Sequence, residues 1–312
     1  MNDADLMVTV ARLYYNEGIT QEKIAHELGL TRMRVIGLLK RARTEGIVQF
    51  RIVHPGADFA QMERRLKEKY GLLDALIVPS IPDNAALLRK SLGKAAGAYL
   101  NKTLESRDVL GIGWGHSVLE TAESLQDFEK RSITVVPLIG GGSDTLPQYD
   151  INALARRFSQ VFGGDCYPLY TLALTDTKEI RDIIVTDSKI SRVLDFWGRM
   201  NTVLVGIGAM TVRLPDLFDK HLEVEPIDFR SLGIVGDVLF RFFNVRGEEV
   251  RLDLSDRMIG TDFAKLRMAR RVIGVACGAT KYKAILGAVR GKIVNVLITD
   301  HDVARKLLEQ ID

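Results

Sequence analysis

Residues 271–281 read Arg271-Val272-Ile273-Gly274-Val275-Ala276-Cys277-Gly278-Ala279-Thr280-Lys281, an apolar run that ends in a short glycine loop. The β-branched residues of the run predict a buried strand over 271–276. The apolar spacing that follows predicts a helix over 281–289. A strand that passes through a glycine loop into a helix is the repeating unit of a parallel α/β sheet.

The same unit recurs along most of the chain after residue 72. We expect strands over 75–79, 108–112, 133–139, 202–207, 271–276 and 294–299, with helices over 84–105, 116–126, 152–162, 187–199, 281–289 and 301–310. This alternation predicts right-handed βαβ units and a parallel sheet that is covered on both faces. Residues 230–252 differ, because a strand over 238–243, turn residues at 244–247 and another strand after them indicate a small antiparallel insertion.

Four of the predicted strands are followed by glycine-rich loops. These loops are Gly113-Trp114-Gly115-His116-Ser117, Gly140-Gly141-Gly142-Ser143, Gly208-Ala209-Met210-Thr211 and Cys277-Gly278-Ala279-Thr280-Lys281. Ligands bind at the C-terminal edge of open parallel sheets. Glycine lets the backbone approach a ligand, and N–H groups at helix starts point at an anion. The loops therefore favour an anion site, with tight turn geometry as the alternative explanation.

The loops do not match the common nucleotide motifs. None is a Walker A sequence, and the run 111–116 has His116 where the dinucleotide fingerprint needs its third glycine. The spacing therefore indicates a phosphorylated small molecule rather than ATP or NAD, and we expect no cofactor.

The first fifty residues predict a separate helical unit. Helices are expected over 5–17, over 21–28 after the cap Thr20, and from the cap Thr31 to about residue 44. Gly29 between the second and third helices fits the tight turn of a helix-turn-helix. An alternating run over 47–53 predicts a strand, which makes the unit a winged variant.

The positive charge of the chain is concentrated in this unit. Residues 29–53 carry six Lys and Arg residues against one Glu, whereas the whole chain has a net charge of only +3. We expect base contacts from the start of the third helix and phosphate contacts further along it. The expected residues are Thr31, Arg32, Met33, Arg34 and Gly37 for bases, with Lys40 and Arg41 for phosphates. A solvated helix face, or a helical hairpin that binds nothing, is the alternative.

Length and composition set the domain organisation and exclude several classes of protein. The 312 residues predict a DNA-binding domain over 1–53 and a larger domain over 54–312, with a linker and connecting helix over 54–72. A hydrophobic content of 46% excludes a mostly disordered chain. Two cysteines without a CxxC pair argue against a disulfide scaffold or a metal site. No membrane segment or secretory signal is present, so we expect a cytoplasmic protein.

Four stretches of the chain stand out together: residues 19–38, Gly111-Ile112-Gly113-Trp114-Gly115, Pro137-Leu138-Ile139-Gly140-Gly141, and above all Gly278-Ala279-Thr280-Lys281 with 284–288 and 291–300. In these stretches, and over nearly its whole length, the chain resembles the SorC-type sugar-binding transcriptional regulators. This resemblance implies a bacterial repressor or activator whose larger domain is similar to phosphosugar isomerases and deaminases. It also implies control of operator DNA binding by a phosphorylated sugar, and assembly as a homodimer or homotetramer.

The resemblance implies roles for single residues. His116 and Ser117 stand where members place hydroxyl residues on an effector phosphate, although His116 replaces the usual threonine. Lys281 matches a basic residue that meets phosphate, and Asp237 matches an acidic residue that contacts sugar hydroxyls. The full expected effector set is Gly113, Trp114, Gly115, His116, Ser117, Gly140, Gly141, Gly142, Asn152, Gly208, Asp237, Gly278, Ala279, Thr280 and Lys281.

Simpler structural roles would also explain three of these residues. Asp237 fits a turn or cap, His116 fits packing beside Trp114, and Asn152 fits the N-cap of the helix that it opens. Ile139 stands where some relatives carry a basic residue, so we expect neither Schiff-base chemistry nor a second phosphate clamp there. This favours a monophosphate or a smaller effector over a bisphosphate.

Two other functions stay open at this point. A sugar-phosphate isomerase or deaminase with an appended DNA-binding module needs a positioned carboxylate base. The candidates near the loops are Asp144, Asp150, Asp176 and Asp237, but no pair has a recognisable spacing, so we assign no catalytic residue. An adaptor that binds no DNA is the third possibility.

Overall fold

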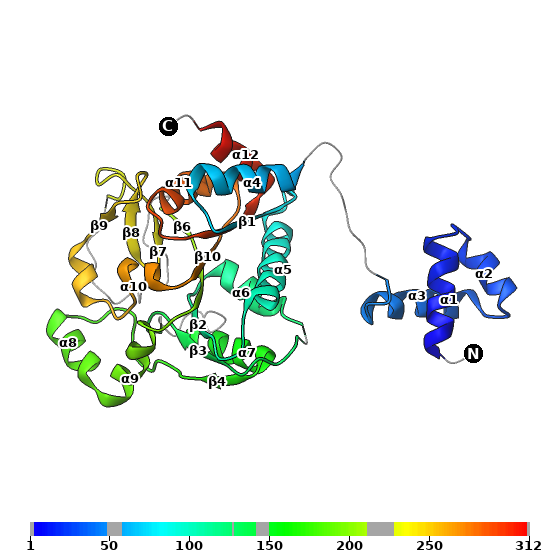
Figure 1. Ribbon diagram of the computed structural model, residues 1–312, viewed down its shortest axis with the longest axis horizontal. Coiled ribbons are helices and arrows are strands. Elements are labelled where there is room, and N and C mark those ends of the chain that lie inside the picture. Colours follow the sequence, from blue (N-terminus) through cyan, green and yellow to red (C-terminus); the bar gives the residue numbers. More distant parts are fainter. Residues whose placement is uncertain (1–2, 49–57, 127, 142–149, 211–227, 311–312) are drawn as a thin grey trace. The chain divides into compact units, whose positions relative to one another are not determined.

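The computed structural model describes residues 3–48, 58–126, 128–141, 150–210 and 228–310. The chain divides into two compact units, Met1–Ala57 and Asp58–Asp312 (Figure 1). The boundary that the sequence predicts, between residues 53 and 54, lies outside the described residues. Each unit has its own hydrophobic core.

The N-terminal unit is a three-helix bundle, formed by α1 (Asp3–Tyr15), α2 (Gln21–Glu27) and α3 (Arg32–Thr44). Each predicted cap is present: the Thr20 hydroxyl accepts from the N–H of Lys23, and the Thr31 hydroxyl accepts from the N–H of Arg34 at 3.2 Å. Gly29 has a φ of +65°, which the turn between α2 and α3 requires.

Nine buried side chains form the core of this unit, and all three helices contribute: Met7, Val10, Ala11, Ile24, Ala25, Val35, Leu38, Leu39 and Ala42. The strand predicted over 47–53 lies mostly outside the described residues. Its first two residues, Ile47 and Val48, are described and do not belong to a strand.

The C-terminal unit is built on a seven-stranded sheet with the order β1-β11-β10-β5-β2-β3-β4, in which every neighbouring pair is parallel. The strands are β1 (Asp74–Val78), β2 (Val109–Ile112), β3 (Ile133–Pro137), β4 (Gly164–Cys166), β5 (Thr202–Gly206), β10 (Arg271–Val275) and β11 (Val296–Asp300). All six strands predicted for this sheet are present. The seventh, β4, carries no apolar run that could have announced it, because it is a short edge strand without a buried residue.

Helices cover this sheet in two groups. One group is α5 (Ala85–Thr103), α6 (His116–Glu123) and α7 (Ile151–Phe162), and the other is α4 (Phe59–Tyr70), α11 (Tyr282–Arg290) and α12 (His301–Glu309). Three further helices are α8 (Lys178–Thr186), α9 (Ser188–Phe196) and α10 (Phe263–Met268). The sequence did not predict α8 or α10; α8 buries no residue, and α10 is less than two turns long.

A second, antiparallel sheet has the order β6-β7-β8-β9 and lies where an insertion was expected. Its strands are β6 (Gly208–Ala209), β7 (Ile234–Val238), β8 (Arg241–Asn244) and β9 (Glu249–Val250). The prediction of one strand over 238–243 is wrong, because Leu239 and Phe240 turn the chain between β7 and β8. Both have a φ of +56°, which tight hairpin turns require and for which sequences normally use Gly or Asn.

Candidate effector site and nucleic-acid interface

The four glycine-rich loops follow four neighbouring strands. β10, β5, β2 and β3 are parallel and lie side by side in that order, so their C-terminal ends share one edge of the sheet. The loops at this edge contain residues 113–117, 140–141, 208–210 and 277–281, which we call the effector edge. Gly142 of the expected set lies outside the described residues.

Two glycines of the effector edge border open space. A Cβ placed on Gly115 or on Gly278 would meet no heavy atom of the described residues within 4 Å. Both have positive φ values, +104° and +95°, and each lies just before a helical turn. The first N–H groups of a helix have no partner within that helix, so these two loops can present N–H donors to an anion.

Three other glycines are explained by packing. A Cβ on Gly113 would press against neighbouring side chains, one on Gly140 would overlap the backbone of Leu172, and one on Gly208 would overlap the Asp237 carboxylate. A glycine at these positions therefore needs no ligand to account for it.

The loop after β3 is tied to other backbone segments. The N–H of Gly140 donates to the Ile259 carbonyl at 2.9 Å, and the N–H of Gly141 donates to the Thr171 carbonyl at 2.7 Å. Because these two N–H groups already donate to carbonyls, this loop has fewer N–H donors for an anion than the loops at residues 115 and 278.

Asn152 lies inside α7 rather than at its cap, so the cap expected at Asn152 is wrong. The cap is Asp150, whose carboxylate accepts from the N–H groups of Asn152 at 2.8 Å and Ala153 at 3.1 Å. The buried Asn152 amide accepts from the N–H of Leu169 at 2.8 Å and donates to its carbonyl at 3.2 Å. These bonds satisfy the side chain without a ligand.

Asp237 performs the turn role that the sequence left open. Its carboxylate accepts from the N–H of Phe240 at 3.0 Å and so holds the β7–β8 turn. Burial raises the pKa of Asp237 to about 6, although the Phe240 hydrogen bond and the charge of Lys281 act in the opposite direction. A contact between Asp237 and an effector stays a prediction.

Lys281 lies at the effector edge, where its ammonium group donates to the Ile207 carbonyl at 2.7 Å. Burial lowers the pKa of Lys281, while the nearby Asp237 carboxylate raises it. The loop that carries Lys281 is fixed through Gly278, whose N–H donates to the Asp300 carboxylate at 2.7 Å. Ala279 and Thr280 form, with Lys281, a short 3₁₀ turn before α11.

His116 begins α6 and is exposed, although its ring is partly shielded from water. Partial burial lowers the pKa of His116, and the positive charges of Arg89 and Lys281 lower it further, so the neutral imidazole is favoured. Cys277, in the neighbouring loop, has its pKa raised to about 11, mainly by burial, which keeps the thiol protonated. Both shifts favour the uncharged side chains, which act as hydrogen-bonding groups rather than as charges or nucleophiles.

Trp114 and Ser117 are buried beside this edge. The Trp114 ring packs edge-on against Phe240, with 4.7 Å between ring centroids, which makes it a core residue. The Ser117 carbonyl accepts from the Thr121 hydroxyl at 2.7 Å within α6.

Sequence reasoning missed one charged residue at this edge. Arg89 lies on α5, yet its charge acts on His116, Cys277 and Lys281. No signal pointed to it, because it follows Leu88 and precedes Lys90 in an ordinary amphipathic helix pattern rather than in a glycine loop.

The predicted DNA-contacting residues lie on α3. All seven are exposed, and Met33 is the most exposed large apolar side chain among those described, at 73%. The Thr31 side chain caps α3, while Gly37 has no described atom near the place of a Cβ. Arg34 and Arg41 both bind the carboxylate of Asp3 on α1.

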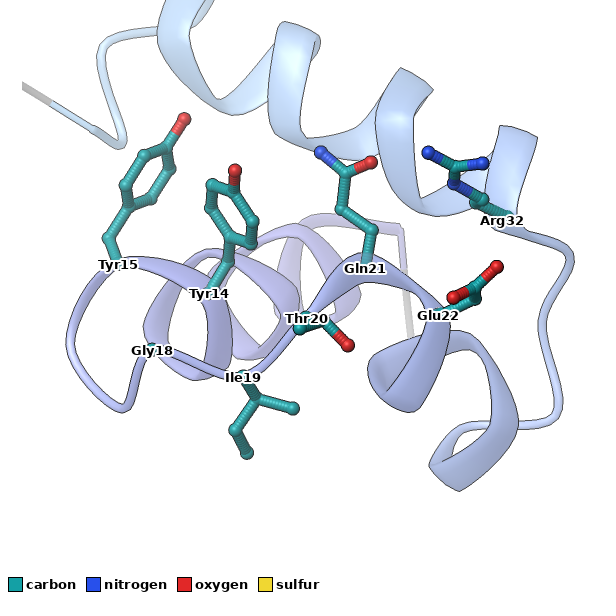
Figure 2. A pocket seen from close by; sticks show the side chains of 8 residues that line it. All are labelled: Tyr14, Tyr15, Gly18, Ile19, Thr20, Gln21, Glu22 and Arg32. Carbon is teal, nitrogen blue, oxygen red and sulfur yellow. The ribbon is translucent and has the colours of Figure 1, made fainter.

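A pocket of about 600 Å³ adjoins the start of α3 (Figure 2). Its lining comes from the end of α1, the start of α2 and the first residue of α3: Tyr14, Tyr15, Gly18, Ile19, Thr20, Gln21, Glu22 and Arg32. Figure 2 shows the Tyr14, Tyr15 and Gln21 side chains on the side of α1 and α2 that faces α3. Of the residues that line this pocket, the sequence predicted only Arg32 as a DNA contact. The other lining residues lie beside Arg32 only because of tertiary packing.

The described parts of the chain contain neither a candidate membrane span nor a candidate metal cluster. No described helix is long and apolar enough to cross a membrane. No group of three or more His, Cys, Asp or Glu residues in those parts is placed to hold a metal ion.

Each of the two units matches a known protein family. Residues 55–309 match the family described as "Putative sugar-binding domain", and residues 9–45 match the family described as "Sigma-70, region 4". The sorbitol operon regulator of Klebsiella pneumoniae is 32% identical over 313 residues, covering 99% of each chain. The deoxyribonucleoside regulator of Bacillus subtilis (strain 168) is 30% identical over 308 residues, covering 98% of each chain.

The fold agrees with a solved structure over the full length. The crystal structure of the full-length sorbitol operon regulator SorC from Klebsiella pneumoniae has a TM-score of 0.80 to this chain, with 32% identity and 99% of each chain covered. A helix-turn-helix unit together with a parallel α/β sugar-binding domain defines a ligand-responsive transcriptional regulator. The chain belongs to the SorC-type family of sugar-binding transcriptional regulators. It is a DNA-binding regulator of carbohydrate metabolism and not an enzyme, which excludes the isomerase and deaminase alternative.

Proposed function

We propose that the effector edge binds the phosphate of a phosphorylated sugar, and that this binding changes the affinity of the helix-turn-helix unit for operator DNA. One observation carries the proposal. Gly115 and Gly278 each leave open space just before a helical turn, on loops that also carry His116 and Lys281. N–H donors, hydroxyls and a cation around such a space are the groups that bind phosphate.

The names of two relatives support a carbohydrate effector. One is named for the sorbitol operon and the other for deoxyribonucleosides. We assign the phosphate to residues 115–117 and 278–281, and the sugar hydroxyls to Asp237. The effector must bind one state of the protein better than another in order to change its DNA affinity.

For the DNA-binding unit, we assign base contacts to the start of α3. Arg32, Met33, Arg34 and Gly37 are exposed there, while Lys40 and Arg41 lie further along the helix for phosphates. The pocket beside Arg32 has room for a phosphate of the DNA backbone next to hydroxyl and amide donors.

The number of subunits can be inferred from the way helix-turn-helix units bind operators. One helix-turn-helix unit covers a single half-site, and operators for such proteins carry two half-sites. We therefore propose a homodimer or homotetramer that acts in the cytoplasm, with 1–53 as the DNA-binding domain and 54–312 as the effector domain. Light scattering of the purified chain at several concentrations measures the assembly.

A panel of sugar phosphates and their unphosphorylated sugars tests the proposed function on the full chain. A bound effector raises the melting midpoint, and the shift grows with the logarithm of the effector's excess over Kd. We expect a shift with a sugar phosphate that is lost in Lys281→Gln, while operator affinity without effector is unchanged. A shift with free sugars alone would show that the edge is not a phosphate site.

A further inference from the structure

Arg89 places a partly buried positive charge at the effector edge. Its Nε atom is buried and has no hydrogen-bond partner, and burying such a group costs free energy. The position of the guanidinium follows from its neighbours. Its positive charge lowers the pKa of His116 on one loop and those of Cys277 and Lys281 on another. Arg89 therefore lies close enough to both loops for its charge to act on their side chains.

The charges around Arg89 do not neutralise it. Among the described residues, Arg89 forms no ion pair with a carboxylate and its Nε has no hydrogen-bond partner. Asp300, which raises the pKa of Cys277, already accepts from the N–H groups of Gly278, Asp302 and Val303. An anion that entered this edge would meet a guanidinium whose charge no described carboxylate pairs with.

We propose that Arg89 is a phosphate ligand of the effector site, binding the anion together with Lys281 and the N–H groups of the 115 and 278 loops. This rests on the proposed function, because it adds a third element, α5, to the same phosphate. An arginine offers a planar pair of donors that matches two phosphate oxygens, which a lysine cannot do. Arg89 would then be a residue that makes the site select phosphorylated over neutral sugars.

Titration calorimetry of the full-length protein with inorganic phosphate tests this, at constant ionic strength set with sodium chloride. We expect Arg89→Gln to weaken phosphate binding by at least about tenfold, the loss of one charge-assisted hydrogen bond. Arg89→Lys keeps the charge and loses the paired donors, so its affinity should fall between the two. Lys90→Gln removes the same charge from the next, exposed position of α5 and should stay within about twofold of wild type.

The outcomes separate this inference from the proposed function. Phosphate binding that is weakened in Lys281→Gln but unchanged in Arg89→Gln would overturn the role of Arg89 and leave the phosphate site in place. No binding of inorganic phosphate or of any sugar phosphate to the wild type would overturn both. Circular dichroism and the melting midpoint without phosphate check folding. If Arg89→Gln does not fold, the test rests on Arg89→Lys. An affinity of Arg89→Lys for inorganic phosphate equal to that of the wild type would contradict a paired contact between Arg89 and the phosphate.

Discussion

Asp3 at the start of α1 pairs with Arg34 in the first turn of α3, with 2.6 Å between carboxylate oxygen and guanidinium nitrogen. Its second oxygen binds Arg41 two turns further along α3. The two guanidinium groups hold the pKa of Asp3 below its ordinary value, with the Arg41 hydrogen bond as the largest cause. Both arginines are proposed DNA contacts, so DNA must compete with Asp3 for them.

Replacing Asp3 with Asn should therefore strengthen DNA binding. We expect roughly a threefold to tenfold gain in affinity at low salt, with a steeper dependence on salt, because freed arginines neutralise more phosphates. Fluorescence anisotropy with a labelled duplex across a salt series measures both quantities. Asp5→Asn removes the same charge from the same helix and serves as the control. Equal affinities for Asp3→Asn and wild type would show that Asp3 does not compete.

Arg34→Ala should weaken operator binding. A guanidinium that reads base edges contributes about 1–3 kcal/mol, so we expect roughly a tenfold to hundredfold loss on the operator and a smaller loss on unrelated DNA. Arg43→Ala is the control, because Arg43 is exposed and lies about two and a half turns further along α3, on the opposite side. Equal losses in both variants, or none in Arg34→Ala, would remove Arg34 from the interface.

Asp237 makes stability depend on pH in a defined window. Its pKa is raised from 3.8 to about 6 in the folded chain, so folding favours the protonated form. The contribution of Asp237 to the free energy of unfolding is therefore fully present below about pH 4. It is lost as the pH rises to about 6, by on the order of 3 kcal/mol. Asp237→Asn keeps an oxygen for the Phe240 N–H but does not titrate.

The measurement is the melting midpoint of both proteins from pH 4 to pH 7.5. The melting midpoint of Asp237→Asn minus that of the wild type should grow between pH 4 and pH 6 and then level off. Groups that titrate in both proteins cancel in this difference. A difference that does not change with pH would mean that Asp237 is not strained by burial.

Gly208→Ala should destabilise the protein, because the added Cβ overlaps the Asp237 carboxylate. We expect about 1–3 kcal/mol, the usual cost of overpacking. Gly206→Ala is the control, since a Cβ there makes only a contact at 3.4 Å with the Trp114 carbonyl.

The double variant Gly208→Ala with Asp237→Ala removes the overlap. Urea unfolding should show that it loses less stability than the two single variants together, by about 1 kcal/mol or more. If the double variant loses as much stability as the two single variants added together, the cost of Gly208→Ala does not come from overlap with Asp237.

Local signals were sufficient for most of the elements. The spacing of apolar residues predicted α1, α2 and α3 with the caps Thr20 and Thr31, and it predicted all six long strands of the parallel sheet. These features depend on residues within a few positions of one another, which a sequence displays directly. The turn at Leu239 and Phe240 escaped prediction because those side chains prefer strands, and the buried Asp237 carboxylate overrides that preference.

The sequence by itself determined the class of this protein: a basic helix-turn-helix ahead of βαβ units whose glycine loops must meet at one edge. Only the tertiary structure decided which glycines leave room for a ligand and which charges stand there. Gly115 and Gly208 look alike in the sequence, but one borders open space and the other a carboxylate. Arg89 reaches the same edge from α5. Burial and proximity across the sheet arise from contacts between distant residues, and no local pattern encodes them.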